Sequence, residues 1–101
     1  MIKTLEIIIN NGIFENIKLL LIYDKNICYK NDKKYLIDNN WKDELIRTIR
    51  TWKEEYGYDN NIDSEEFTIT IISDRKEKIH GKGIFPNNYH RLIELLGEIH
   101  D

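Results

Sequence analysis

Three histidines and one glutamate are the first residues in this sequence whose types and spacing suggest chemistry. His90 and Glu94 lie four residues apart, the spacing that places two metal ligands on one face of a helix. His80 or His100 could supply a further ligand. The HExxH pattern of hydrolytic zinc sites is absent. Two interpretations stay open, a metal or small-ligand site around His80, His90 and Glu94 or a solvated helix flank, and we favour the flank.

The single cysteine and a pair of glycines are weaker candidates. Cys28 falls in a predicted strand, with no helix N-terminus to lower its pKa, so we expect a structural thiol rather than a nucleophile. Gly81 and Gly83 flank Lys82 as in a fragment of a phosphate loop, but the rest of that motif is missing. These glycines more readily indicate a bulge or a close crossing of a helix over the sheet. No catalytic constellation emerges, so we predict neither catalytic residues nor a cofactor.

Positive charge gathers on one predicted strand. Its candidate polyanion-binding residues are Arg75, Lys76, Lys78 and Lys82. Asp74 and Glu77 offset part of this charge, and no aromatic residues alternate with the lysines to stack on bases. Weak nucleic-acid binding therefore stays an alternative that the pattern disfavours.

Negative charge gathers between residues 54 and 66. The acidic residues of this stretch are Glu54, Glu55, Asp59, Asp63, Glu65 and Glu66. Such a cluster can steer a basic protein partner, or it can be an ordinary solvated loop. We retain these residues as candidate protein-binding residues.

The elements that must position these residues follow from the apolar pattern. The predicted strands are residues 3–9, 14–23, 27–30, 67–71 and 77–83. The Asn10-Asn11-Gly12 turn is predicted to join the first two strands. Leu20 and Ile22 give the second strand apolar residues on its other side as well. The centre of this strand can therefore be covered on both sides. Residues 31–34 are polar enough for a loop.

Two helices complete the pattern. The first is predicted over residues 41–56, with Asn40 as its N-cap and Gly57 just past its end. Its apolar stripe comprises Trp41, Leu45, Ile49, Trp52 and Tyr56. The last helix starts after Asn87 or Asn88. Its stripe comprises Tyr89, Leu92, Ile93, Leu96 and Ile99.

The order β-β-β-α-β-β-α predicts an α+β fold. Short turns join the strand pairs, so we expect an antiparallel sheet of four or five strands with both helices packed on one face. A chain of 101 residues is long enough for one core, and residues 1–101 should form a single domain.

Composition narrows the class of protein. The chain is 41% hydrophobic and 33% charged, a balance typical of a folded domain rather than a disordered one. No apolar run approaches the ~18 residues of a membrane helix, and the first residues lack the pattern of a secretory signal. One cysteine permits no internal disulfide, so we expect a cytoplasmic protein. The net charge of −3 does not by itself predict a nucleic-acid or membrane partner.

The second half of the chain has a layout shared with known proteins. An alternating strand at residues 67–71, a basic return strand ending near Gly81, and a Phe85-Pro86 entry precede the last amphipathic helix. In this layout the chain resembles a broad group of small uncharacterised bacterial α+β proteins. More distantly, its hairpin-helix-hairpin-helix order is similar to that of emfourin-type inhibitors of thermolysin-like metalloproteases. The resemblance implies a compact α+β fold and a non-catalytic, protein-binding role, and it assigns no inhibitory residue.

Taken together, these patterns favour a small, non-enzymatic protein-binding module. We expect an inhibitor or regulator of another protein, present as a monomer or homodimer, of bacterial or phage type. A phage or mobile-element anti-defence role, or an immunity-type role, fits by analogy.

Overall fold

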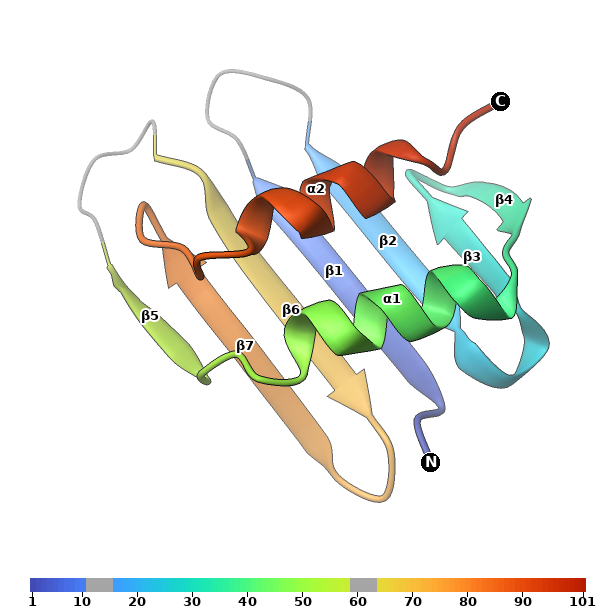
Figure 1. Cartoon of the computed structure of the whole chain (residues 1–101), viewed down its shortest axis with the longest axis horizontal. Coiled ribbons are helices and arrows are strands. Elements are labelled where there is room, and N and C mark those ends of the chain that lie inside the picture. The colour runs from blue at the N-terminus through green and yellow to red at the C-terminus, as the bar shows by residue number, and fades with distance from the viewer. Residues whose placement is uncertain (11–15, 59–63) are drawn as a thin grey trace.

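A computed structural model describes residues 1–10, 16–58 and 64–101, and in it two helices lie across one face of a single sheet (Figure 1). Seven strands form this sheet in the described part of the chain. They are β1 (Thr4–Asn10), β2 (Ile17–Ile22), β3 (Ile27–Lys30), β4 (Lys33–Leu36), β5 (Glu55–Tyr58), β6 (Glu66–Ile72) and β7 (Lys76–Lys82). The helices are α1 (Asn39–Ile49) and α2 (Tyr89–Gly97), and a short 3-10 turn covers Tyr23–Lys25.

The sheet is mixed, with the strand order β4-β3-β2-β1-β6-β7-β5. Neighbouring strands pair antiparallel except β5 and β7, which pair parallel. The predicted α+β class is confirmed. The structure corrects the predicted antiparallel sheet of four or five strands and its element order, because β4 and β5 were not anticipated. The predicted turn at Asn10-Asn11-Gly12 falls mostly outside the described residues.

The strand β4 replaces a predicted loop. Asn31 and Asp32 have φ angles of 49° and 70°, which suit the two-residue turn of a hairpin, and they bring β4 back along β3. Tyr35 then lies opposite Cys28 and packs against the core. The remaining residues of this edge strand are free to be polar, which is why the sequence resembles a loop.

The helix α1 ends at Ile49, well before the predicted end at residue 56. Trp52 leaves the helix, and its indole Nε1 donates to Oδ1 of Asn88 at 2.7 Å. Its ring centroid lies 5.8 Å from that of Phe67. Trp52 is 9% exposed, so its burial is as predicted although its helical conformation is not. The chain beyond it becomes β5 rather than a further helical turn.

The helix caps also differ from prediction. Asp38, not Asn40, is the N-cap of α1, and its Oδ1 accepts from the backbone N–H of Trp41 at 2.8 Å. Asn88 precedes α2 as predicted, but its side chain makes no capping bond. Its Nδ2 instead donates to the backbone oxygen of Thr48 at 3.0 Å, so Asn88 joins the two helices.

The core lies between the sheet and the helices. Its buried residues are Leu5, Ile7, Ile9, Leu19, Leu21, Cys28, Trp41, Leu45, Ile49, Trp52, Phe67, Ile69, Ile79, Leu92, Leu95, Leu96 and Ile99. The helical stripes are therefore confirmed at most positions. One correction concerns Ile93, which is 39% exposed while Leu95 is buried instead. No described helix is long and apolar enough to span a membrane.

Two lysines on the covered side of the sheet stabilise the ends of this layer. Lys42 is 8% exposed, and its Nζ donates to the backbone oxygen of Tyr23 at 2.8 Å and to Oδ1 of Asn26 at 2.6 Å. Lys30 donates from Nζ to the backbone oxygens of Leu96 and Ile99, at 2.9 and 2.8 Å. Lys30 thereby satisfies carbonyl groups at the C-terminal end of α2.

Candidate functional site

The face of the sheet opposite the helices carries no described helix or strand over it (Figure 1). We call it the open face. Residues paired across neighbouring strands point to the same face, so the strand register arranges the open face in rows. The first row is Leu36, Ile27, Ile22, Thr4, Ile72 and Lys76. The second row is Lys34, Tyr29, Leu20, Glu6, Thr70 and Lys78. The third row is Lys18, Ile8, Thr68, His80 and Glu55.

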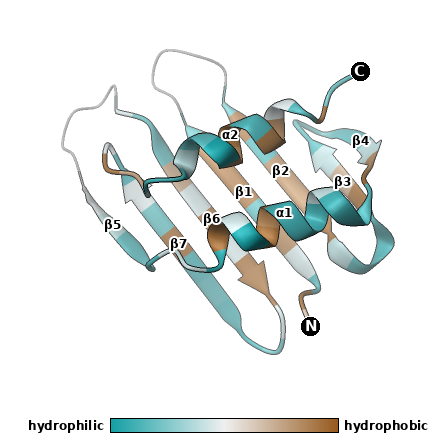
Figure 2. Cartoon of the chain, viewed as in Figure 1, coloured by the Kyte–Doolittle hydropathy of each residue, from teal (hydrophilic) through white to brown (hydrophobic). Residues whose placement is uncertain are grey.

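Apolar side chains are concentrated over β2, β3 and β4. This apolar patch comprises Leu20, Ile22, Ile27, Tyr29 and Leu36. Leu36 is 81% exposed and Tyr29 is 38% exposed, and the other three are partly exposed. Figure 2 shows the same contrast along the sheet, with β2 mostly hydrophobic and β7 mostly hydrophilic. The centre of β2 is therefore not covered on both sides by described elements, which corrects the prediction.

Lysines flank the apolar patch on both sides. Lys34 and Lys18 lie on β4 and β2, and Lys76 and Lys78 lie on β7. All four are exposed. Within residues 1–10, 16–58 and 64–101, none of these four flanking lysines forms an ion pair. The open face thus combines an apolar patch over β2, β3 and β4 with lysines that pair with no described carboxylate.

His80 forms a well-defined polar cluster at the other edge of the open face. Its Nδ1 lies 2.8 Å from Oε1 of Glu55, and its Nε2 lies 2.7 Å from Oε2 of Glu66. A carboxylate oxygen only accepts hydrogen bonds, so both contacts are hydrogen bonds when the ring is the doubly protonated imidazolium. The bond to Glu66, and then the bond to Glu55, raises the pKa of His80 above its ordinary value. The resulting imidazolium connects β5, β6 and β7.

The structure does not bring the predicted metal ligands together. His80 lies on the open face, whereas His90 and Glu94 are exposed on α2 in the helix layer. The ring of His100 faces the backbone oxygen of Asp101, 2.8 Å from Nδ1. Among the described residues, no group of three or more His, Cys, Asp or Glu side chains is placed to hold a metal. A ligand site around His80, His90 and Glu94 stays a prediction that this geometry does not support.

Cys28 and Gly81 are packing positions. Cys28 is fully buried on the covered face of β3, and burial raises the pKa of its thiol, so the group is a poor nucleophile. At Gly81, a Cβ atom would lie 2.6 Å from Cε1 of Phe67 and 2.8 Å from the backbone oxygen of Ile84. The glycine is therefore needed for a close approach, by an aromatic ring and a loop rather than by a helix.

The four acidic candidates that the structure describes do not form one surface. Glu55 and Glu66 are bonded to His80, and Glu65 accepts a hydrogen bond from the Tyr89 hydroxyl at 2.6 Å. Burial, with the Glu65 bond, raises the pKa of Tyr89. Glu54 is exposed. Asp59 and Asp63 lie outside the described residues. A role of the six acidic candidates in protein binding stays a prediction.

The four basic candidates do not all lie on the same surface. Lys76, Lys78 and Lys82 project on the open face, while Arg75 lies in the turn before β7, with its Nε 3.2 Å from Oε1 of Glu77. On the helix side, the same hairpin borders a groove of about 770 Å³ that Trp52 helps to line. The predicted basic strand is therefore real as a surface feature, and its polyanion binding stays a prediction.

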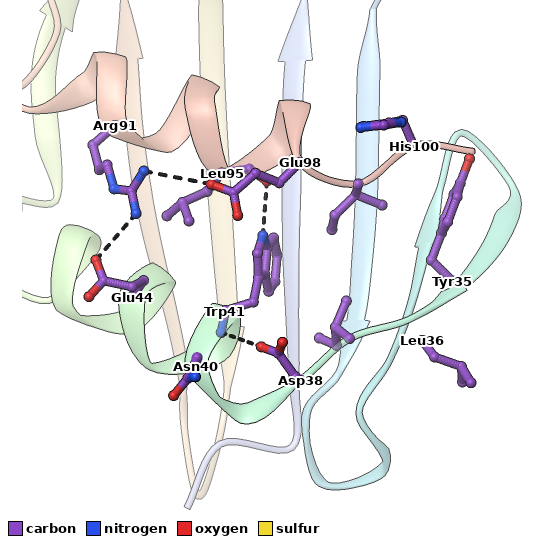
Figure 3. Close-up of a pocket in the computed structure, with 12 residues that line it drawn as sticks. Tyr35, Leu36, Asp38, Asn40, Trp41, Glu44, Arg91, Leu95, Glu98 and His100 are labelled. Carbon is purple, nitrogen blue, oxygen red and sulfur yellow. Dashed lines mark hydrogen bonds and ion pairs between the residues drawn. The ribbon is translucent and has the colours of Figure 1, made fainter.

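A cleft of about 330 Å³ opens on the helix side between α1, the end of α2 and β4 (Figure 3). Its charged groups pair with one another, because Nη2 of Arg91 lies 3.5 Å from Glu44 and Nη1 lies 3.7 Å from Glu98. The indole Nε1 of Trp41 donates to the backbone oxygen of Leu95 at 2.9 Å. The contacts of Arg91 with Glu44 and of Trp41 with Leu95 join the two helices, so these groups serve the fold.

Comparison with known proteins adds no relative. No protein-family model matches the sequence, and no curated protein or solved structure shows detectable similarity to it. The resemblance to emfourin-type inhibitors therefore stays a hypothesis based on the order of elements.

Sequence reasoning missed the apolar patch as a surface. The pattern did place Leu20 and Ile22 on the second side of their strand, which is where the structure has them. Leu36 was missed because residues 33–36 were expected to lie in a loop or beyond it. The available signal was the alternation of Lys34 and Leu36 with Tyr35, which is short but strand-like.

Proposed function

We propose that this protein is a non-enzymatic protein-binding module that binds its partner through the open face of its sheet. The observation that carries the proposal is the apolar patch, where Leu36 is 81% exposed beside Tyr29. Contiguous exposed apolar surface commonly marks an interaction site, because its burial is favourable by roughly 25 cal/mol per Å².

The shape of the open face supports a protein rather than a small molecule as the ligand. Its side chains stand on neighbouring strands of one continuous sheet, which gives a broad surface. Small-molecule sites are usually concave and enclose most of the ligand. Protein interfaces combine an apolar centre with a polar rim, the arrangement that the apolar patch and the flanking lysines provide.

We extend the proposal to the effect on the partner. A module without chemistry of its own acts by occupying its partner's surface, so we expect an inhibitor or regulator in the cytoplasm of a bacterial or phage-infected cell. The resemblance in element order to emfourin-type inhibitors, and the analogy to anti-defence and immunity proteins, support this form of the proposal.

The test uses two side chains of equal exposure on opposite faces. Tyr29 is 38% exposed on the open face, and Ile93 is 39% exposed on α2. Wild type, Tyr29→Ser and Ile93→Ser would each be used to capture proteins from a lysate of the source cell. The affinity of any captured partner would then be measured with purified components. Circular dichroism would verify that both variants are folded.

We expect Tyr29→Ser to weaken the purified complex by about 30-fold or more, because truncation of a central aromatic anchor typically costs ~2 kcal/mol. Ile93→Ser should bind as wild type does. Equal binding by all three proteins, or a loss confined to Ile93→Ser, would exclude the open face as the binding surface.

A further inference from the structure

We infer that the partner meets the open face with a surface that is apolar opposite the apolar patch and acidic on both sides of it. This inference rests on the proposed function and specifies the chemistry of the partner. It follows from where the flanking lysines lie relative to the apolar patch.

The flanking lysines lie on both sides of the central strands. In the second row of the open face, Lys34 and Lys78 are separated by five strand intervals, or about 24 Å between backbones at ~4.8 Å per interval. Between them in the same row lie Tyr29 and Leu20, and then Glu6 and Thr70. This span is close to the width of a standard interface, which buries ~800 Å² on each partner.

Among the described residues, no carboxylate of the open face forms an ion pair with these lysines. Glu55 and Glu66 are already hydrogen-bonded to His80. Glu6 lies in the middle of the second row, where its cross-strand neighbours are Leu20 and Thr70. A partner whose carboxylates lie opposite the flanking lysines would therefore supply the missing charge, and complementary charge favours both encounter and correct register.

Three other occupants fit this face less well. A second copy would present the same lysines around its apolar patch, and its Glu55 and Glu66 are already bonded to His80. Nucleic acid would find Tyr29 as the aromatic ring of the apolar patch, with the carboxylate Glu6 in the centre of the row. A membrane surface favours apolar side chains that project beyond the charges, whereas here Lys34 and Leu36 stand on the same face of one strand.

Selection from a random peptide library displayed on phage tests the inference without a known partner. Peptides would be selected on the wild-type protein and sorted by whether Tyr29→Ser abolishes their binding. We expect the Tyr29-dependent peptides to combine apolar residues with an excess of Asp and Glu, and their affinity to fall as salt is added. The double variant Lys76→Glu, Lys78→Glu should bind them about tenfold more weakly and should itself select basic peptides. Lys53→Glu, an exposed charge reversal away from the open face, is the control and should leave the acidic preference unchanged.

The outcomes separate this inference from the proposed function. Tyr29-dependent peptides without an acidic excess would overturn the inferred partner chemistry while leaving the binding surface in place. A complete lack of Tyr29-dependent peptides would overturn both. Phosphatidylserine-containing vesicles and duplex DNA would be measured alongside, as would self-association. One of these ligands could bind the wild-type protein more tightly than the selected peptides do, and that binding could be lost in the double lysine variant. This result would overturn the inference that the partner is an acidic protein.

Discussion

The two faces of the sheet are built from the same strands, yet the middle of one face is completely buried and the same strands are partly exposed on the other. Ile7 and Ile8 are adjacent on β1 and identical in chemistry. Ile7 is 0% exposed beneath the helices, whereas Ile8 is partly exposed on the open face. The difference comes from the layer above each residue and not from the residue type. Apolar residues on the uncovered face are therefore the ones available for binding.

The lysines of the two faces differ in the same way. On the covered side, Lys30 and Lys42 donate to carbonyl oxygens and so serve the fold. On the open face, Lys76 and Lys78 are exposed and form no ion pair with a described residue. The same side chain is structural under the helices and available for recognition on the opposite face.

The largest effect should come from the pair Ile7→Ala and Ile8→Ala. Removing buried methyl groups at Ile7 leaves a cavity, so we expect a loss of about 2–5 kcal/mol in the free energy of unfolding. The same change at the partly exposed Ile8 should cost about 1 kcal/mol or less, because solvent and neighbouring side chains fill the space. Urea denaturation of the three proteins measures both values. Losses of equal size at the two positions would mean that the open face is covered in solution.

The next largest difference in the free energy of unfolding is expected between Lys42→Met and Lys78→Met. Methionine keeps most of the length of the Lys42 side chain but removes the donor to Tyr23 and Asn26, so we expect about 1–3 kcal/mol of destabilisation. At Lys78 the change in stability should stay within about 0.5 kcal/mol. Thermal denaturation reports the stability of each variant. A Lys78 variant as unstable as the Lys42 variant would show that this open-face lysine has a structural role.

Much of the fold could be predicted because most buried positions follow a regular period. The strands at residues 3–9 and 67–71 and the apolar stripe from Trp41 to Ile49 have one face that must be apolar, and they lie where the pattern places them. β4 and β5 could not be predicted in this way. They are short edge strands, and their pairing depends on partners that are distant in sequence or joined by a local turn.

The candidate site was harder to predict than the fold. Burial of Trp52 is consistent with a helical stripe, but its bond to Asn88 depends on where α2 begins in space. The partners of His80 likewise come from β5 and β6, which only the tertiary structure brings together. Charge and hydropathy along the chain identified the lysines of β7 and the second apolar side of β2, which lie on the open face. They did not show that no helix covers it.

The smallest expected effect concerns His80, the open-face residue whose two ring nitrogens both contact carboxylates. Its folded-state pKa is raised above the ordinary value of 6.5 by Glu66 and Glu55. The charged groups around it are these two glutamates and, two positions away along β7, Lys78 and Lys82. A raised histidine pKa means that the cluster stabilises the folded state fully below about pH 6.5, and that this stabilisation is lost as the pH rises through the folded-state pKa.

We expect the loss to be about 1 kcal/mol or less, since His80 lies near the surface and its charge is partly screened. The measurement is the free energy of unfolding between about pH 6 and pH 9, compared for wild type and His80→Gln. The variant should lack this part of the pH dependence, because glutamine does not titrate.

Hydrogen exchange locates the effect in the fold. Protection of the amides in β5 should fall with rising pH, after correction for intrinsic exchange, while protection of the amides in β1 should not change. An identical pH profile in wild type and variant would mean that the imidazolium contributes nothing to the edge of the sheet. A loss of protection spread evenly over β1 and β5 would place the effect in the whole fold instead of the open-face edge.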